Sequence, residues 1–159
     1  IFILIIYDII VMNSLKYNII LFLVMFFISF FFNSMNVLAY DIKHIYFSYT
    51  LIYSSLYMAS LMIWAHQIVY YIYSGMIHIN ILLFGLFLSC LFAIILRKQH
   101  FVNEKQWLKR MITHHSTALT TTNKLLNKNI NNNVKQLAKN IIIQQEYEIN
   151  NMKELLKKY

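Results

Sequence analysis

The sequence changes character at the end of one apolar stretch, INILLFGLFLSCLFAIIL, at residues 79–96. Arg97 and Lys98 follow it at once, and the chain beyond them is rich in charge. An apolar run of this length is enough for a helix to cross the hydrocarbon of a bilayer, and two basic residues at its end suit the headgroup region. The stretch therefore predicts a transmembrane helix and marks a boundary between two solvents.

The composition supports this boundary. Of the whole chain, 59% is hydrophobic and the mean hydropathy is +0.53, which is too high for a soluble domain of 159 residues. Residues 1–96 carry only four charges, whereas residues 97–159 hold twelve of the fourteen Lys and Arg and four of the six acids. The absence of Pro and the presence of only two Gly favour long uninterrupted helices, so we expect an all-α fold. Heavy use of Ile, Asn and Lys is typical of an AT-rich genome.

Two further membrane spans are predicted before this one, at residues 17–40 and 45–73, which gives a transmembrane region at residues 13–98. The second is rich in Tyr and Ser, as expected of a helix that packs against its neighbours. Residues 1–12 are predicted to be a leader or a non-native upstream extension. A cleavable signal peptide is the alternative for the first span, but the run is long and lacks a small-residue cleavage site.

The side of the membrane on which the C-terminal part lies is ambiguous. Lys43, Arg97 and Lys98 fall on one side of a three-span protein and Lys16 falls on the other, so the positive-inside rule leans toward a cytoplasmic C-terminal part.

Residues 99–159 are predicted to form an antiparallel helical hairpin. Apolar residues recur at spacings of three and four over about residues 104–126 and again over 132–158, and the Asn-rich run NKNINNN lies between them. If the chain reverses near Asn129, each residue of the first helix lies at the same height as one residue of the second, because both helices have the same rise per residue. The predicted pairs are Trp107 with Met152, Met111 with Glu148, His114 with Gln145, Ala118 with Ile141, and Leu125 with Val134.

This pairing predicts a cluster of polar groups within an apolar seam. Burying an unpaired carboxylate costs several kcal/mol, so Glu148 requires a partner. His114 or His115 could hydrogen-bond to it, with Gln145 beside them. Alternatively, a bound cation could gather Met111, His114, His115, Glu148 and Met152, since imidazole with thioether selects copper or a similarly soft ion. Each residue type alone is more often structural than a ligand; their convergence makes the two interpretations about equal.

The motif MITHHSTAL at residues 111–119, followed by IIIQQEYEINNM at 141–152, resembles the domain of unknown function 305 family. Matching positions include Met111, His114, His115, Gln145, Glu148 and Met152, and the similarity covers about residues 103–156. The resemblance implies a ferritin-like helical fold and, for some members, periplasmic binding of copper or silver, which conflicts with the orientation from charge. Thr113 stands where the family usually has Pro, and Thr121 where a second Met is common, which weakens the argument for a soft metal. The preceding spans resemble the membrane-anchored members more loosely.

Within the second predicted span, Met58, Met62 and His66 recur every four residues on one face. An ionisable group inside a span suggests a functional role, and we note these three as a possible intramembrane site. The more ordinary interpretation is a hydrogen bond from His66 to a Ser or Tyr of a neighbouring span.

The sequence thus predicts a membrane-anchored protein that binds a soft metal ion, Cu(I) or Ag(I), through a His/Met cluster. No enzyme is expected, because there is no paired nucleophile and base and no Gly-rich phosphate loop. A two-helix hairpin buries little core, so a homodimer through the hairpin is expected. The alternative is a structural or interaction protein whose basic hairpin lies against an anionic membrane surface. Nucleic acid is not an expected partner, because the Lys residues are dispersed.

Overall fold

The computed structural model describes the backbone of residues 2–159 and the side chains of residues 15–159. The regular secondary structure of these residues consists of helices and contains no strand, which confirms the predicted all-α class. The leader predicted for residues 1–12 lies outside the residues whose side chains are described. The chain divides into two compact units, residues 1–30 with 53–98 and residues 31–52 with 99–159.

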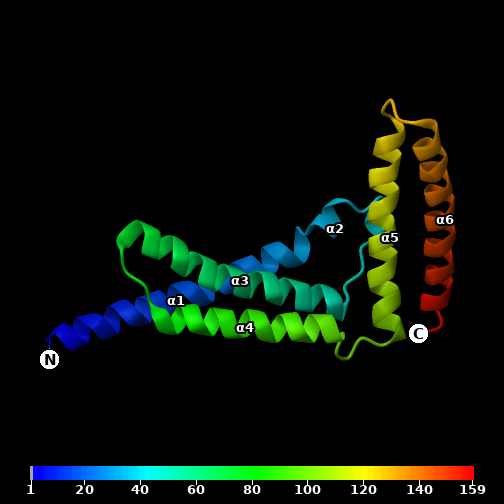
Figure 1. Cartoon of the computed structure of the whole chain (residues 1–159). Helices are drawn as coiled ribbons and strands as arrows, with labels where there is room; N and C mark the ends of the chain where they lie inside the picture. The colour runs from blue at the N-terminus through cyan, green and yellow to red at the C-terminus, as the bar shows by residue number, and fades with distance from the viewer. Residues whose placement is uncertain (1) are drawn as a thin grey trace. The chain divides into compact units, whose positions relative to one another are not determined.

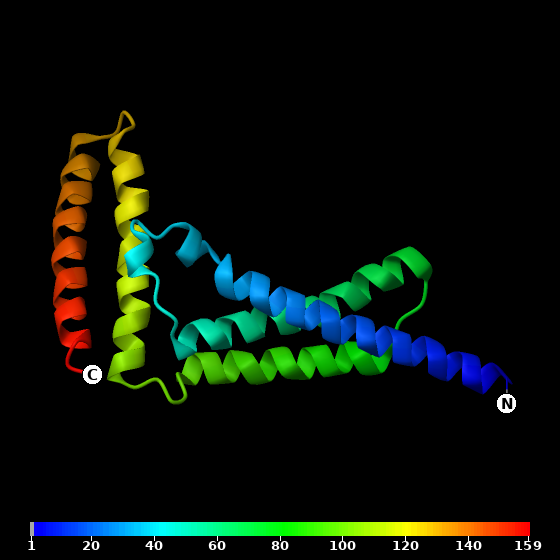
Figure 2. The ribbon, with the colours of Figure 1, turned by 180° about the vertical axis from the view of Figure 1, so that it is seen from behind.

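The first unit contains the long apolar helices α1 (Phe2–Phe31), α3 (Tyr49–Ser74) and α4 (Ile79–Lys98). Figures 1 and 2 show α3 and α4 side by side, joined by residues 75–78, and the first of these, Gly75, has a φ of 70°, which favours glycine. The two helices approach closely at Gly85, where an added Cβ would lie 3.0 Å from Ile63 Cγ2 and from the Trp64 backbone nitrogen. Glycine permits this close approach because it has no side chain.

By length and mean hydropathy, two segments of the described residues could cross a membrane, Leu15–Val37 and Ile79–Lys98. Only 6% and 11% of their apolar windows are buried, so their apolar surface is left exposed, unlike that of a core helix in a soluble protein. The predicted span at residues 45–73 does not meet this criterion, because the Tyr, Ser and Gln side chains of α3 lower its hydropathy.

The predicted boundaries of the first two spans also need correction. The helix predicted at residues 17–40 ends at Phe31, because Asn33 caps a new short helix, α2 (Ser34–Val37), by accepting from the backbone N–H groups of Met35 and Asn36. The second helix begins at Tyr49 rather than at 45. The residues between α1 and α3, residues 32–48, form a connector that contains α2 and the 3₁₀ turn η1 (Ile42–His44).

The second unit is built on α5 (Glu104–Leu126) and α6 (Asn132–Leu156), which lie side by side (Figures 1 and 2). Asn103 caps the start of α5 and Asn131 the start of α6, each through its side-chain oxygen. A buried apolar cluster holds the helices together: Leu108, Ile112, Leu119, Ile149 and Met152. The connector packs on α5, and its Tyr46 covers part of the same cluster.

Candidate functional site

The closest polar contact between α5 and α6 joins a histidine to a carboxylate. His115 Nδ1 lies 2.9 Å from Glu148 Oε2, with the side chains 14% and 35% exposed. The second carboxylate oxygen, Oε1, accepts a hydrogen bond of 2.6 Å from Gln144 Nε2, one turn earlier on α6. His115 therefore provides the partner that a half-buried Glu148 requires.

The register of the two helices differs from the predicted one by about a turn. Glu148 is level with His115, not with Met111, and the hydroxyl of Tyr159 donates to Glu104 at the other end of the pair. The prediction placed the reversal symmetrically about Asn129. The connection at residues 127–131 instead offsets the helices, which the sequence pattern does not specify.

The buried face of α5 is also rotated relative to the predicted one. Leu108, Ile112 and Leu119 are buried, whereas the predicted seam residue Trp107 is 51% exposed and His114 is exposed. Adjacent residues on a helix differ by about 100° in direction, so a shift of one position moves the stripe to a neighbouring face. Thr113 and Ser116, which the pattern left outside the seam, are fully buried against the connector.

The five predicted metal-ligating residues are thus only partly brought together. His115 faces Glu148, and one turn away Met111 packs against the buried cluster that contains Met152. His114 points to a different side, its ring centroid 6.0 Å from that of His115 and nearly perpendicular to it. Gln145 is half-buried beside the seam. Among the residues with described side chains, no three His, Cys, Asp or Glu lie close enough together to hold a metal ion.

The protonation of His115 depends on burial. Burial lowers the pKa of His115 below its ordinary value of 6.5, Glu148 opposes this shift, and His114 adds to it. The net effect favours the neutral imidazole near neutral pH, which is the form that can donate a lone pair to a metal.

A second polar cluster, not found from the sequence, lies where the connector meets α5. Ser116 Oγ accepts from the Tyr40 backbone N–H at 2.8 Å and lies 2.9 Å from His44 Nδ1. Thr113 Oγ1 donates to the His44 carbonyl at 2.7 Å and accepts from the Tyr46 N–H at 3.2 Å. The sequence offered no signal for this contact, because about 70 residues separate the partners.

The same cluster gives a physical reason for Thr113 in place of the proline usual in the resembled family. A proline has no hydroxyl and could neither donate to the His44 carbonyl nor accept from the Tyr46 N–H. Thr113 therefore serves to fix the connector on α5.

The possible intramembrane site is not assembled within the described residues. Met58 and Met62 are 49% and 37% exposed, and the ring of His66 lies 5.0 Å from that of Tyr17. The His66 ring thus lies near the rings of Tyr17 and Tyr70, and its Nδ1 is buried without a hydrogen-bond partner.

Comparison with known proteins adds one family. An uncharacterized protein of Acanthamoeba polyphaga mimivirus is 44% identical over 61 residues, which are 38% of this chain. The chain spans about two fifths (40%) of the length of that relative. No solved structure matches. Residues 96–156, which include α5 and α6, match the family model described as "Domain of unknown function (DUF305)", which confirms the resemblance over this segment.

Proposed function

We propose that α5 and α6 form a membrane-anchored binding module for a soft transition-metal ion, Cu(I) or Ag(I), held at their seam by Met111, His115 and Met152. The observation that carries the proposal is the placement of His115. Its Nδ1 is buried and lies 2.9 Å from Glu148 Oε2, one turn from the two thioethers. A carboxylate held against one nitrogen of an imidazole leaves the other nitrogen, here Nε2, as the one that can bind a metal ion.

The chemistry of these donors favours a soft ion. A borderline or hard ion such as zinc or iron takes imidazole, thiolate and carboxylate ligands, and the described side chains offer only one close His–Glu contact for it. Thioether with imidazole suits Cu(I) or Ag(I). Glu148, with one oxygen against His115, would orient the ring in the way that carboxylates commonly support metal-bound histidines.

A second copy of the chain would complete this site in the proposed homodimer. On α6, Leu137 shares the stripe of Glu148 and is 59% exposed, and on α5 His114 is exposed beside His115. Packing the helix pair against its copy would bury Leu137 in a four-helix arrangement, with the exposed His114 available as a ligand across the interface.

The membrane anchor is proposed to have three spans, on a topological argument. The connector after α1 belongs to the same unit as α5, which follows α4. If α1 and α4 both cross the membrane, the chain between them must return across it. The helix α3 has 26 residues, enough to cross, and is the one long helix in that stretch.

The module is proposed to bind rather than to catalyse. The structure does bring a serine and a histidine together, Ser116 and His44, but they are 0% and 8% exposed. A substrate could not reach Ser116 Oγ, so this contact is assigned to packing and not to nucleophilic catalysis.

The test is a set of variants of the full chain titrated with Ag(I), and with Cu(I) under reducing conditions. His115→Ala should weaken binding at least tenfold, and Met111→Leu with Met152→Leu should do so without loss of volume. His100→Ala is the matched control, because His100 is exposed and precedes α5, outside the seam between α5 and α6. Helical circular dichroism should remain unchanged in every variant. Wild-type protein that binds neither ion, or a His115→Ala variant that binds as wild type does, contradicts the proposal.

A further inference from the structure

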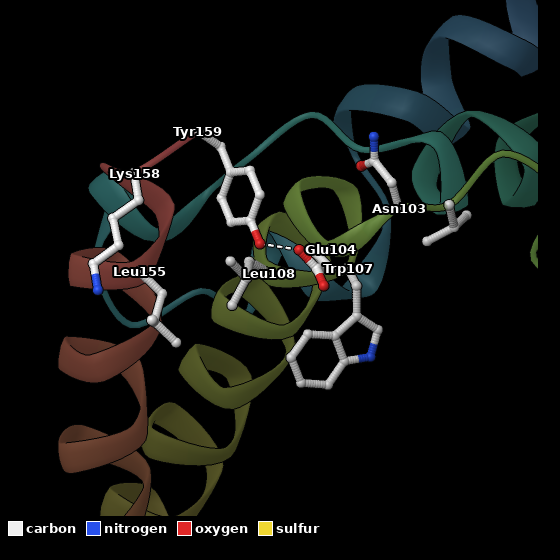
Figure 3. A pocket seen from close by; sticks show the side chains of 8 residues that line it. Asn103, Glu104, Trp107, Leu108, Leu155, Lys158 and Tyr159 are labelled. Atoms are coloured by element: carbon white, nitrogen blue, oxygen red, sulfur yellow. Dashed lines mark hydrogen bonds between the residues drawn. The ribbon is translucent and has the colours of Figure 1, made fainter.

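The end of the helix pair at which α5 begins carries an open pocket. Its volume is about 860 Å³, and its lining includes Glu104, Trp107, Leu155, Lys158 and Tyr159. Figure 3 shows the Tyr159 hydroxyl directed to Glu104, with the Trp107 indole and the Leu155 side chain beside them. The lining combines aromatic rings, aliphatic side chains and charges of both signs.

Aromatic side chains at this end of the helix pair are exposed. Trp107 is 51% exposed, Tyr159 56%, and Phe101, in the segment just before α5, 84%. Single exposed apolar residues need no explanation, but aromatic side chains gathered at one end of a helix pair do. Trp and Tyr with this exposure are enriched at membrane–water interfaces, where one side of the ring is apolar and the other is wet.

The charge at this end of the pair is basic. Lys105, Lys157 and Lys158 lie there, and Glu104 is engaged by the Tyr159 hydroxyl. Lys157 pairs with Glu154 at 2.6 Å, and Lys105 Nζ donates to the Tyr159 carbonyl at 2.9 Å. The Lys158 side chain lines the pocket and is exposed, so its ammonium is available to an anion.

The covalent chain limits the distance between this end of the pair and the last apolar helix. Only residues 99–103 separate the end of α4 at Lys98 from the start of α5 at Glu104. A chain of that length reaches at most about 20 Å, and here it is shortened by a turn in which Gln99 and Phe101 have φ values of 50° and 56°. If α4 spans a membrane, the pocket end of the pair therefore lies within reach of the headgroups.

We infer that this pocket binds an anionic phospholipid of the bilayer in which α4 is embedded, with the phosphate at Lys105 and Lys158 and the upper acyl chain against Trp107 and Leu155. The basic residues complement an anionic headgroup, and the exposed rings match the interfacial region. The inference goes beyond the proposed metal site, which lies further along the seam at His115, but it shares the proposed membrane anchor.

The test uses the full chain reconstituted in phosphatidylcholine bilayers that contain phosphatidylglycerol. Either lipid is brominated in turn, and quenching of tryptophan fluorescence gives the relative binding constant of the two lipids. The chain has two tryptophans, Trp64 and Trp107, so the difference between wild type and Trp107→Phe isolates the signal of Trp107. We expect Trp107 to be quenched severalfold more by phosphatidylglycerol than by phosphatidylcholine.

Charge variants test the site itself. Lys105→Gln with Lys158→Gln should bring the lipid preference at Trp107 close to one, since each Lys near an anionic surface is worth about a fivefold change in binding. Lys124→Gln with Lys128→Gln, at the opposite end of the helix pair, should leave the preference unchanged. Equal quenching by the two lipids, or none at Trp107, overturns the inference. Quenching of Trp64 reports separately whether α3 lies in the bilayer, and Ag(I) titration of the same samples reports on the metal site.

Discussion

At the scale of single residues, four consecutive side chains of α5 face three different surroundings. Thr113 and Ser116 bind the connector, His115 faces Glu148 of α6, and His114 is exposed. This division follows from the helical turn of about 100° per residue. The two adjacent histidines therefore differ in their roles: His115 belongs to the seam within one chain, and His114 is proposed to serve the interface between two.

The buried His44 predicts an acid-sensitive contact between connector and α5. Burial lowers the pKa of His44 below 6.5, Lys153 of α6 adds to the shift, and Asp41 of the connector opposes it. Because the folded-state pKa is lowered, the neutral form stabilises the fold above about pH 6.5, and this stability is lost as the pH falls through the folded pKa. The melting temperature should therefore fall between about pH 7 and pH 5.

Variants of the histidines identify the source of this fall. His44→Gln should reduce the loss of melting temperature on acidification, and His115→Gln should reduce it further, since burial also lowers the pKa of His115. His100→Gln, at an exposed position, serves as the control and should retain the full loss. Asp41, whose pKa is lowered from 3.8 by a hydrogen bond from the Lys43 backbone, titrates below this window. A melting temperature that does not change between these pH values would contradict the assignment.

At the scale of elements, the register of α5 against α6 can be tested by cross-linking. In a Cys90→Ala background, His115→Cys with Glu148→Cys should react readily with a short bifunctional thiol reagent, because the native side chains are 2.9 Å apart. Met111→Cys with Glu148→Cys, the pair expected from a symmetric reversal at Asn129, should react poorly. Gel mobility after proteolysis between the helices distinguishes the two, and preferential linkage of the second pair would refute the observed register.

The packing of α3 on α4 depends on the glycine at their closest approach. Gly85→Leu should destabilise this pair by about 1–3 kcal/mol, because even its Cβ would lie 3.0 Å from the backbone nitrogen of Trp64, which cannot move aside as a side chain can. Cys90→Leu adds similar bulk to an exposed position of the same helix and is the control. Thermal unfolding in detergent, followed by circular dichroism, measures the difference, and equal melting of the two variants would show that the close approach is unimportant.

At the scale of the whole molecule, the proposed three-span topology predicts which segments share a side of the membrane. Single cysteines replace Ile42 in the connector, Asn129 between α5 and α6, and Tyr73 near the turn before α4, again with Cys90→Ala. These positions are exposed, Ile42 at 81% and Tyr73 at 94%. A membrane-impermeant maleimide should label positions 42 and 129 from one side and position 73 from the other. Labelling of all three from the same side would exclude a crossing by α3.

The sequence by itself determined the helical class and the extents of α4, α5 and α6 to within two residues. These features depend on local periodicity, on apolar run length and on capping by Asn, all of which act within a few turns of chain. The His–Glu contact was foreseen only as a choice between His114 and His115. The sequence pattern could not decide between them. Rotating α5 by one residue, or sliding it by one turn along α6, leaves the spacings of three and four residues unchanged.

Only the tertiary structure decided which face of α5 is buried and what covers it. The connector contributes Tyr40, His44 and Tyr46 to that face through contacts between residues about 70 positions apart. No local pattern marks such partners. The entropic cost of closing a loop grows only slowly with its length, so many different segments could reach the same surface at a similar cost. The buried polar groups add to this match: Ser116 and Thr113 form hydrogen bonds with the connector backbone, and these contacts favour the orientation in which this face of α5 meets the connector.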